Sequence, residues 1–142
     1  MTGILSAEVA FVCVSTPAGP DGSCDASLVE GVVRSVAHAG YRGVLAIKST
    51  VEPGTTERLA VAHPDLRLAF VPEFLRERAA HVDFVEHHDV CVIGTKSSDD
   101  FSLLERVHGP LPKRVIQLTP TEAELAKYFS NLLNALRVVF AN

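Results

Sequence analysis

Residues 43–56 of this chain have the sequence GVLAIKSTVEPGTT, an apolar run followed at once by hydroxyl side chains, a proline and a glycine. The first six residues, Gly43–Lys48, are short and almost continuously apolar, which is typical of a strand that is buried on both faces. Pro53 and Gly54 then open a helix that we expect to run to about Ala62. A buried strand that passes directly into a helix is the repeating unit of layered α/β domains.

The same alternation continues on both sides of this stretch. Four more apolar runs are predicted to be buried strands: Glu8–Val14, Leu66–Val71, Val90–Gly94 and Arg114–Leu118. Two further segments show the spacing of amphipathic helices: Ala26–Ala39, with Asp25 as its expected N-cap, and Ser98–Val107. We therefore predict an α/β fold with a mostly parallel sheet of about five strands and a long C-terminal helix.

That last helix, residues 120–142, is the longest periodic segment of the chain. Thr119 or Thr121, followed by Glu122 or Glu124, resembles a helix start. One apolar stripe is made of Leu125, Phe129, Leu132, Leu133, Leu136 and Phe140. Because so small a domain cannot cover this stripe, we expect the helix to pack on another chain, or the chain to be a shortened form of a longer protein.

Composition excludes several classes of function. The chain has 142 residues, of which 47% are apolar and 21% charged, with a net charge of -4, which argues against a nucleic-acid partner. No apolar run is long enough to span a membrane, and residues 1–8 do not resemble a secretory signal, so we expect none. The three cysteines fit a reducing compartment, so we expect a cytoplasmic protein, with Cys13 and Cys91 buried in strands.

Polar side chains gather where the predicted strands end. Thr16 and Pro17 follow the first strand, Ser49 and Thr50 the second, and Glu73 the third. Ligands of open α/β sheets bind beyond the carboxyl ends of the strands, so these residues are candidates for a site. Hydroxyls in such positions also serve as plain helix caps, and Glu73 could equally be a solvated surface acid.

The last helix adds a second polar set. Lys127, Asn131 and Asn134 project from one side of it, where an ammonium and two carboxamides could stabilise a developing oxyanion or simply form the wet face. Several acids and imidazoles lie in one further segment: His81, Asp83, His87, His88 and Asp89. Their spacing matches no standard ligand pattern, so we predict no metal site.

Four blocks of the sequence together resemble the UDP-glucose/GDP-mannose dehydrogenase family, the NAD-dependent nucleotide-sugar 6-dehydrogenases. They are VSTPAGPDGSCDASLVE (14–30), KSTVEPGTTERLA (48–60), VPEFLRERAAHVDF (71–84) and TEAELAKYFSNLLNALRVVFAN (121–142). The resemblance implies a partial Rossmann-like domain over residues 1–119. It also implies that residues 120–142 begin the central interdomain and dimerisation helix, which would bind a second copy or a complementing chain.

The resemblance also implies chemistry, in which a nucleotide-sugar alcohol is oxidised to a carboxylate as NAD⁺ is reduced. Cofactor-binding residues would be Thr16, Pro17, Ser49 and Thr50, and catalytic residues would be Thr50, Glu73, Lys127 and Asn131. Thr50 and Glu73 would hold and deprotonate water, and Lys127 and Asn131 would stabilise the oxyanion. Substrate-binding residues would be Glu73, Phe74, Leu75, Arg76, Lys127 and Asn131.

Departures from the family pattern are equally informative. The chain contains no GxGxxG loop for a pyrophosphate and no later block with the family's cysteine nucleophile. Ser15 and Arg78 stand where the family has glycine, and Asp89 where an arginine is usual. Three hypotheses therefore stay open: a fragment or shortened member of the dehydrogenases, a non-catalytic sugar-nucleotide-binding or dimerisation module derived from them, and a degenerate reading frame whose product self-associates.

Overall fold

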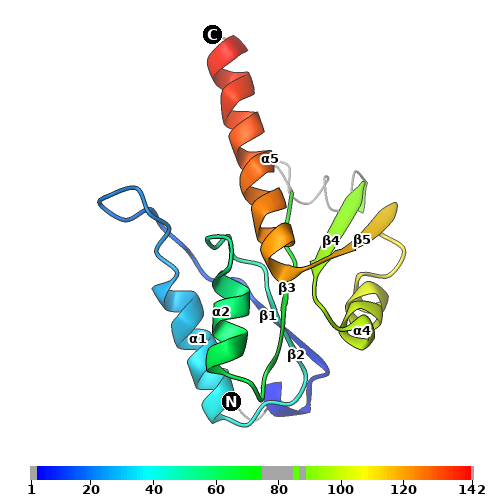
Figure 1. The fold of residues 1–142 in the computed structure, drawn as a ribbon. Coiled ribbons are helices and arrows are strands. Elements are labelled where there is room, and N and C mark those ends of the chain that lie inside the picture. Colours follow the sequence, from blue (N-terminus) through cyan, green and yellow to red (C-terminus); the bar gives the residue numbers. More distant parts are fainter. Residues whose placement is uncertain (1–2, 75–84, 87–88, 142) are drawn as a thin grey trace.

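The computed structural model describes residues 3–74, 85–86 and 89–141, and it shows one sheet with helices on both faces (Figure 1). The elements follow the alternation expected from the sequence. In chain order they are η1 (Ile4–Ser6), β1 (Val9–Val12), α1 (Ser27–His38), β2 (Val44–Ile47), α2 (Thr55–Ala62), β3 (Arg67–Phe70), β4 (Val90–Gly94), α4 (Ser98–His108), β5 (Arg114–Leu118) and α5 (Pro120–Ala141). The predicted α/β class is confirmed.

The five strands lie side by side in the order of the sequence. β1 pairs with β2, β2 with β3 and β4 with β5 in parallel, whereas β3 and β4 are antiparallel and share the single pair Phe70 and Gly94. The prediction of a mostly parallel sheet is therefore confirmed. Because β1, β2 and β3 run in the same direction, their carboxyl ends, and the residues that follow them, meet at one edge of the sheet.

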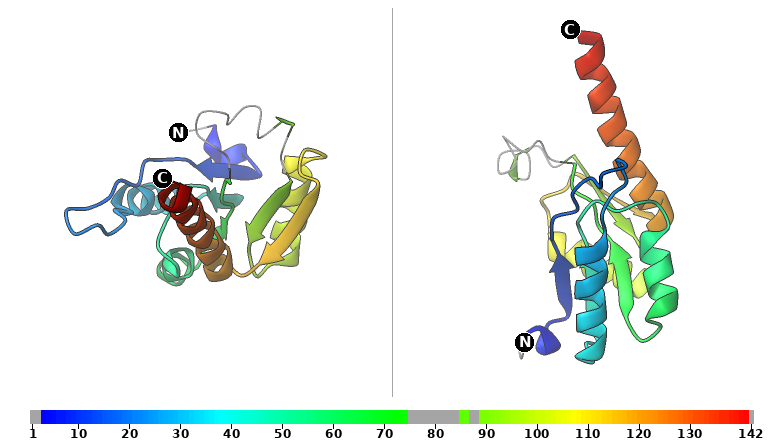
Figure 2. Two further views of the ribbon diagram at one scale, coloured as in Figure 1. Left: turned by 90° about the horizontal axis from the view of Figure 1, so that it is seen from above. Right: turned by 90° about the vertical axis from the view of Figure 1, so that its left-hand side faces the viewer.

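Two hydrophobic cores form on opposite faces of the sheet. On one face α1, α2 and the start of α5 pack around Val29, Val33 and Phe70, none of which is exposed to solvent. On the other face α4 contributes the fully buried Leu104. Figure 2 shows this three-layer arrangement from two further directions. Side chains that project from opposite faces of the sheet therefore contact different helices.

The outer strands are less buried than the sequence predicts. The buried pattern holds for β2, but Phe11 on β1 is 39% exposed and β5 has no buried residue. Cys13, expected in the interior, is exposed, whereas Cys91 on β4 is buried as expected. The reason is position, because β1 and β5 are the two edges of the sheet. Apolar composition alone does not distinguish an edge strand from a central one.

Local polar contacts stabilise the first turns of two helices, α1 and α5. Asp25 was predicted to be the N-cap of α1, but Ala26 holds that position and makes no side-chain cap. Asp25 still serves the same end, because Ser27 N donates to its Oδ1 at 2.9 Å. At α5 the expected capping arrangement is present: Thr119 N and Thr119 Oγ1 both donate to Glu122 Oε2, at 2.8 and 2.7 Å.

Helix α5 leaves the body of the molecule and projects into solvent (Figure 1). Its buried residues, Pro120, Ala123 and Glu124, all lie in its first two turns. The predicted apolar stripe is uncovered, since Phe129 is 68% and Leu136 43% exposed. Among the residues that the structure describes, no helix combines the length and apolar character that crossing a membrane requires.

Candidate functional site

The polar residues predicted to form a site follow β1, β2 and β3 at the carboxyl edge of the sheet, and α5 passes over this edge. Thr16, Thr50 and Asn131 are brought together in one cavity of about 430 Å³. We call it the Thr50 cavity, and its walls are completed by Ala18, Gly22, Ser23, Cys24, Tyr128, Leu132 and Ala135. Segments far apart in the sequence therefore converge as the strand directions predict.

The lining of the Thr50 cavity is polar but uncharged. Its lining residues carry the hydroxyls of Thr16, Ser23, Thr50 and Tyr128, the carboxamide of Asn131 and the thiol of Cys24, and none carries a carboxylate or an ammonium. Burial raises the pKa of Tyr128 to about 12, with a further increase from the neighbouring Cys24, so the phenol stays protonated. Neutral donors and acceptors of this kind match sugar hydroxyls or a carboxamide better than they match a pyrophosphate.

Ser49 and Pro17 occupy the same edge but do not line the Thr50 cavity. The Ser49 hydroxyl, which is almost fully buried, donates to Val14 O at 2.7 Å and accepts from Val14 N at 2.9 Å. Pro17 O accepts from Asp25 N at 2.9 Å, which closes the loop after β1. Both residues therefore fasten main-chain segments that border the cavity.

Lys127 reaches the main chain at the end of β3. Its Nζ donates to Glu73 O at 2.6 Å and lies 5.7 Å from the centre of the Phe74 ring. Burial lowers the pKa of Lys127, and the nearby charge of Glu73 partly offsets that effect. The ammonium is thus placed beside two of the residues predicted to contact substrate.

The Glu73 carboxylate points elsewhere. It forms an ion pair with Lys48 and lines a separate hollow of about 310 Å³, whose walls include Val107 and His108 of α4. Since α4 and α5 cover opposite faces of the sheet, the carboxylate is on the far side from the Thr50 cavity. The structure therefore brings Lys127 to the Glu73 carbonyl, but it places the Glu73 carboxylate and Thr50 in different cavities.

Two predicted substrate-binding residues, Leu75 and Arg76, lie outside the described residues, as do Arg78 and most of the histidine segment. Asn134, the third polar residue of the helix face, is exposed and does not line the Thr50 cavity. Within the described ranges, no group of histidine, cysteine, aspartate and glutamate side chains is arranged to hold a metal ion.

Sequence reasoning missed the role of Glu124, which was considered only as an acid at a helix start. Its side chain is fully buried and accepts hydrogen bonds from Gly54 N and from Thr56 N and Oγ1. The signal was present, because Glu124 lies three and seven positions before Lys127 and Asn131 and so shares their face of the helix.

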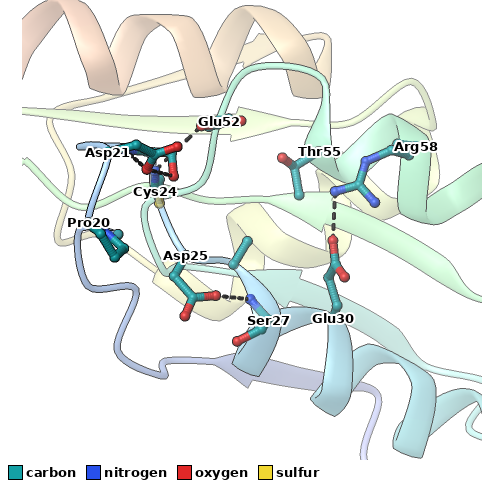
Figure 3. A pocket seen from close by; sticks show the side chains of 12 residues that line it. Pro20, Asp21, Cys24, Asp25, Ser27, Glu30, Glu52, Thr55 and Arg58 are labelled. Carbon is teal, nitrogen blue, oxygen red and sulfur yellow. Dashed lines mark hydrogen bonds and ion pairs between the residues drawn. The ribbon is translucent and has the colours of Figure 1, made fainter.

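A larger hollow of about 690 Å³ lies beside the Thr50 cavity, between the loop after β1 and the start of α1 and α2 (Figure 3). Its lining is acidic, with Asp21, Asp25, Glu30 and Glu52. The one cation among its lining residues, Arg58, is paired with Glu30 at 2.7 Å. A phosphate-bearing ligand is repelled by such a surface, so this hollow is not a nucleotide site.

Comparison with known proteins gives a consistent result. Residues 1–112 match the sequence model described as "UDP-glucose/GDP-mannose dehydrogenase family, NAD binding domain". The chain is 32% identical to the GDP-mannose 6-dehydrogenase and 34% identical to the UDP-glucose 6-dehydrogenase of Pseudomonas aeruginosa, over 98% and 99% of its length. These matches cover only 35% and 34% of the two relatives, so the chain spans about a third of their length.

Solved structures show the same relation. The chain is similar to a ternary complex of GDP-mannose dehydrogenase from Pseudomonas aeruginosa, with a TM-score of 0.84 and 30% identity. It is also similar to a UDP-glucose dehydrogenase from the archaeon Pyrobaculum islandicum, with a TM-score of 0.87 and 36% identity. In each case 99% of this chain superposes on 35% of the other.

Proposed function

The chain belongs to the UDP-glucose/GDP-mannose dehydrogenase family, whose cofactor is NAD, and on this premise we propose that it supplies part of the dinucleotide and nucleotide-sugar site of a 6-dehydrogenase. The observation that carries the proposal is the Thr50 cavity, where Thr16, Thr50 and Asn131 meet beyond the carboxyl ends of parallel strands. Residues 1–119 would form the dinucleotide-binding part, and residues 120–142 the start of an interdomain helix.

The residues at this edge of the sheet suit some groups of NAD⁺ but not its pyrophosphate. A cavity of about 430 Å³ is within the range of small-molecule sites, and its hydroxyls and carboxamide suit a ribose or a nicotinamide amide. The chain has no Gly-rich loop to bind the pyrophosphate, and Ser49 and Pro17 support the edge through main-chain contacts. When bound, NAD⁺ would supply a hydride acceptor for the alcohol carbon, and the residues of this chain would position the cofactor and the substrate.

Lys127 and Asn131 are proposed to stabilise negative charge on the substrate oxygen. An ammonium on a packed helix is a fixed positive charge, and partial burial strengthens its field by excluding water. Phe74, whose ring lies under the same ammonium, is a proposed substrate contact along with Leu75 and Arg76. Asn131 lines the same cavity as Thr50, together with Leu132 at the edge of the apolar stripe.

Glu73 is proposed as the base that takes a proton from water held by Thr50. In the structure its carboxylate is paired with Lys48, so this ion pair must open before the carboxylate can accept a proton from water. To act with Thr50, the Glu73 side chain must leave the α4 face and turn toward α5. We expect a rotation about the Glu73 side-chain bonds when a nucleotide sugar occupies the edge.

The present separation of Glu73 and Thr50 favours a second candidate function. A non-catalytic sugar-nucleotide-binding module would keep the Thr50 cavity without the oxidation step, and nothing in such a module requires Glu73 to face it. Turnover separates the two candidates: formation of NADH from a nucleotide sugar supports the dehydrogenase, whereas binding without NADH supports the module.

The exposed stripe of α5 supports a proposal about assembly. Leu125, Phe129 and Leu136 form a continuous apolar surface that the described part of this chain does not cover, and a second copy or a complementing chain would bury it. Leu136→Glu is expected to weaken self-association at least about tenfold in sedimentation equilibrium. Asn134→Asp, a charge added on the opposite side of the helix, is the matched control and should leave association unchanged.

A cytoplasmic location stays a prediction from the sequence.

The binding site itself is tested by calorimetry on the purified chain with NAD⁺, UDP-glucose and GDP-mannose. Asn131→Ala removes a lining residue of the Thr50 cavity, whereas Asn134→Ala makes the same chemical change outside it. We expect Asn131→Ala to lower affinity about tenfold, as the loss of one well-placed hydrogen bond should, and Asn134→Ala to have no effect. Equal effects of the two changes, or no binding of any ligand, would contradict the proposal.

A further inference from the structure

A fully buried carboxylate joins α5 to the start of α2. Glu124 Oε1 accepts hydrogen bonds from Thr56 N at 2.8 Å and from Thr56 Oγ1 at 2.6 Å, and its Oε2 accepts from Gly54 N at 2.5 Å. The side chain has no exposed surface. Burial raises the pKa of this carboxyl group, and the hydrogen bonds from Thr56 and Gly54 partly offset that effect, so each buried oxygen has at least one donor.

The contact completes a helix that lacks its own cap. Helix α2 begins at Thr55 after Gly54, which has a φ of +94° and no side chain with which to cap the first turn. The free N–H groups of this turn need acceptors, and they favour a negative charge. Glu124 supplies the acceptors, but from a helix that is distant in the sequence.

This placement links the two halves of the Thr50 cavity. Gly54 and Thr56 end the segment that begins after β2 and carries Thr50. On the other side, Glu124 lies on the same face of α5 as Lys127 and Asn131. The carboxylate therefore fixes the helix that carries one set of proposed site residues to the segment that carries the other.

Glu124 holds the start of α5 together with the contacts of Thr121 to Glu57 and of Lys127 to Glu73, and these attachments set the position of the residues further along the helix. Residues 131–140 are all exposed and the buried residues of α5 lie in its first two turns, so the direction of the outer half depends on how the start of the helix is held. Asn131 is about 10 Å along the axis from Glu124, and a tilt of about 10° would move it by about 2 Å. Hydrogen bonds tolerate only a few tenths of an ångström, so such a tilt would separate Asn131 from a ligand bound at Thr50.

We propose that Glu124 is a positioning residue, which sets the orientation of α5 so that Lys127 and Asn131 meet the segment that carries Thr50. The proposal rests on the function proposed above for this cavity. A purely structural cap would stabilise the fold without determining where α5 points, and this difference can be measured.

The test compares Glu124→Ala with Ser97→Ala, which removes a cap of similar kind elsewhere. Ser97 is the N-cap of α4, its side chain accepts from Asp100 N at 3.1 Å, and it does not line the Thr50 cavity. Residual dipolar couplings of backbone amides give the orientation of α5 relative to β2 and β3. Calorimetry gives the affinity for NAD⁺ and for UDP-glucose.

We expect Glu124→Ala to change the α5 couplings, so that they no longer fit the wild-type orientation, and to weaken ligand binding at least about tenfold. Ser97→Ala should change neither the α5 couplings nor the ligand affinity, even if it lowers the unfolding midpoint as much as Glu124→Ala does. Wild-type α5 couplings in Glu124→Ala would overturn the proposal.

Two further arms keep the result interpretable. Glu124→Gln retains one oxygen acceptor for Thr56 but presents an amide to Gly54 N, so an intermediate change in the couplings is expected and the variant serves if Glu124→Ala does not fold. If the wild-type chain binds neither ligand, the proposed function fails, and the couplings still decide whether Glu124 positions α5.

Discussion

Replacing Ser49 by alanine tests whether this residue binds cofactor or holds the sheet edge together. The Ser49 hydroxyl is only 8% exposed and bonds both to the N–H and to the carbonyl of Val14. Ser49→Ala leaves these two main-chain groups without their partner. Each main-chain group that loses its hydrogen-bond partner costs on the order of 1 kcal/mol where water has partial access to it. We therefore expect Ser49→Ala to lower the free energy of unfolding by about 2 kcal/mol.

Urea unfolding followed by circular dichroism measures this loss. With a denaturant dependence of about 2 kcal/mol per molar for a domain of this size, the midpoint should fall by about 1 M. Ser35→Ala is the control, since Ser35 Oγ donates to Gly31 O at 2.8 Å on an exposed helix face, and its removal should change stability by less than about 0.5 kcal/mol. An unchanged midpoint for Ser49→Ala, together with a loss of NAD⁺ affinity, would refute the structural interpretation.

Three further predictions concern packing, protonation and thiol reactivity. At Gly94 a Cβ would stand 2.7 Å from a side-chain carbon of α5, so Gly94→Ala should cost about 1–3 kcal/mol in urea unfolding, whereas Gly31→Ala, with open space around it, should stabilise the protein by about 0.5–1 kcal/mol. Burial lowers the pKa of Lys127 below 10.5, so the unfolded chain binds more protons than the folded chain between these two pKa values. The unfolding free energy of wild type, relative to that of Lys127→Met, should therefore rise as the pH increases toward 10.5. A difference that does not change with pH would contradict this prediction. Cys13 should react readily with Ellman's reagent in the folded protein, but Cys91, with its pKa raised by burial to about 11, should react only in urea.

The fold was largely predictable because the central strands and the helices carry strong local signals. β2 and its following turn have continuous apolar residues and a Pro-Gly helix start, and α5 has a long period and a capping box at Thr119 and Glu122. The burial of β1 and β5 was not predictable, because it depends on which strands lie at the sheet edges. That is a property of topology, which apolar composition does not encode.

The candidate site was predictable in part, for a similar reason. Position after a parallel strand predicted that Thr16 and Thr50 lie at one edge, whereas helical spacing did not predict that α5 brings Asn131 into the same cavity. The direction of the Glu73 side chain could not be predicted, since it depends on the ion pair with Lys48 across the sheet. Glu124 escaped notice because an acid in the first turns of a helix is ordinarily a solvated partner of the dipole, and only tertiary packing buries it.

A crystal structure or an NMR titration of this chain with NAD⁺ tests the central claim most directly. We expect the ligand to contact Thr16, Thr50 and Asn131 at the carboxyl edge of the sheet, with chemical-shift changes at the residues that line the Thr50 cavity. Binding in the acidic hollow near Glu52, or at the hollow beside Lys48, with no change at Thr50 and Asn131, would contradict it.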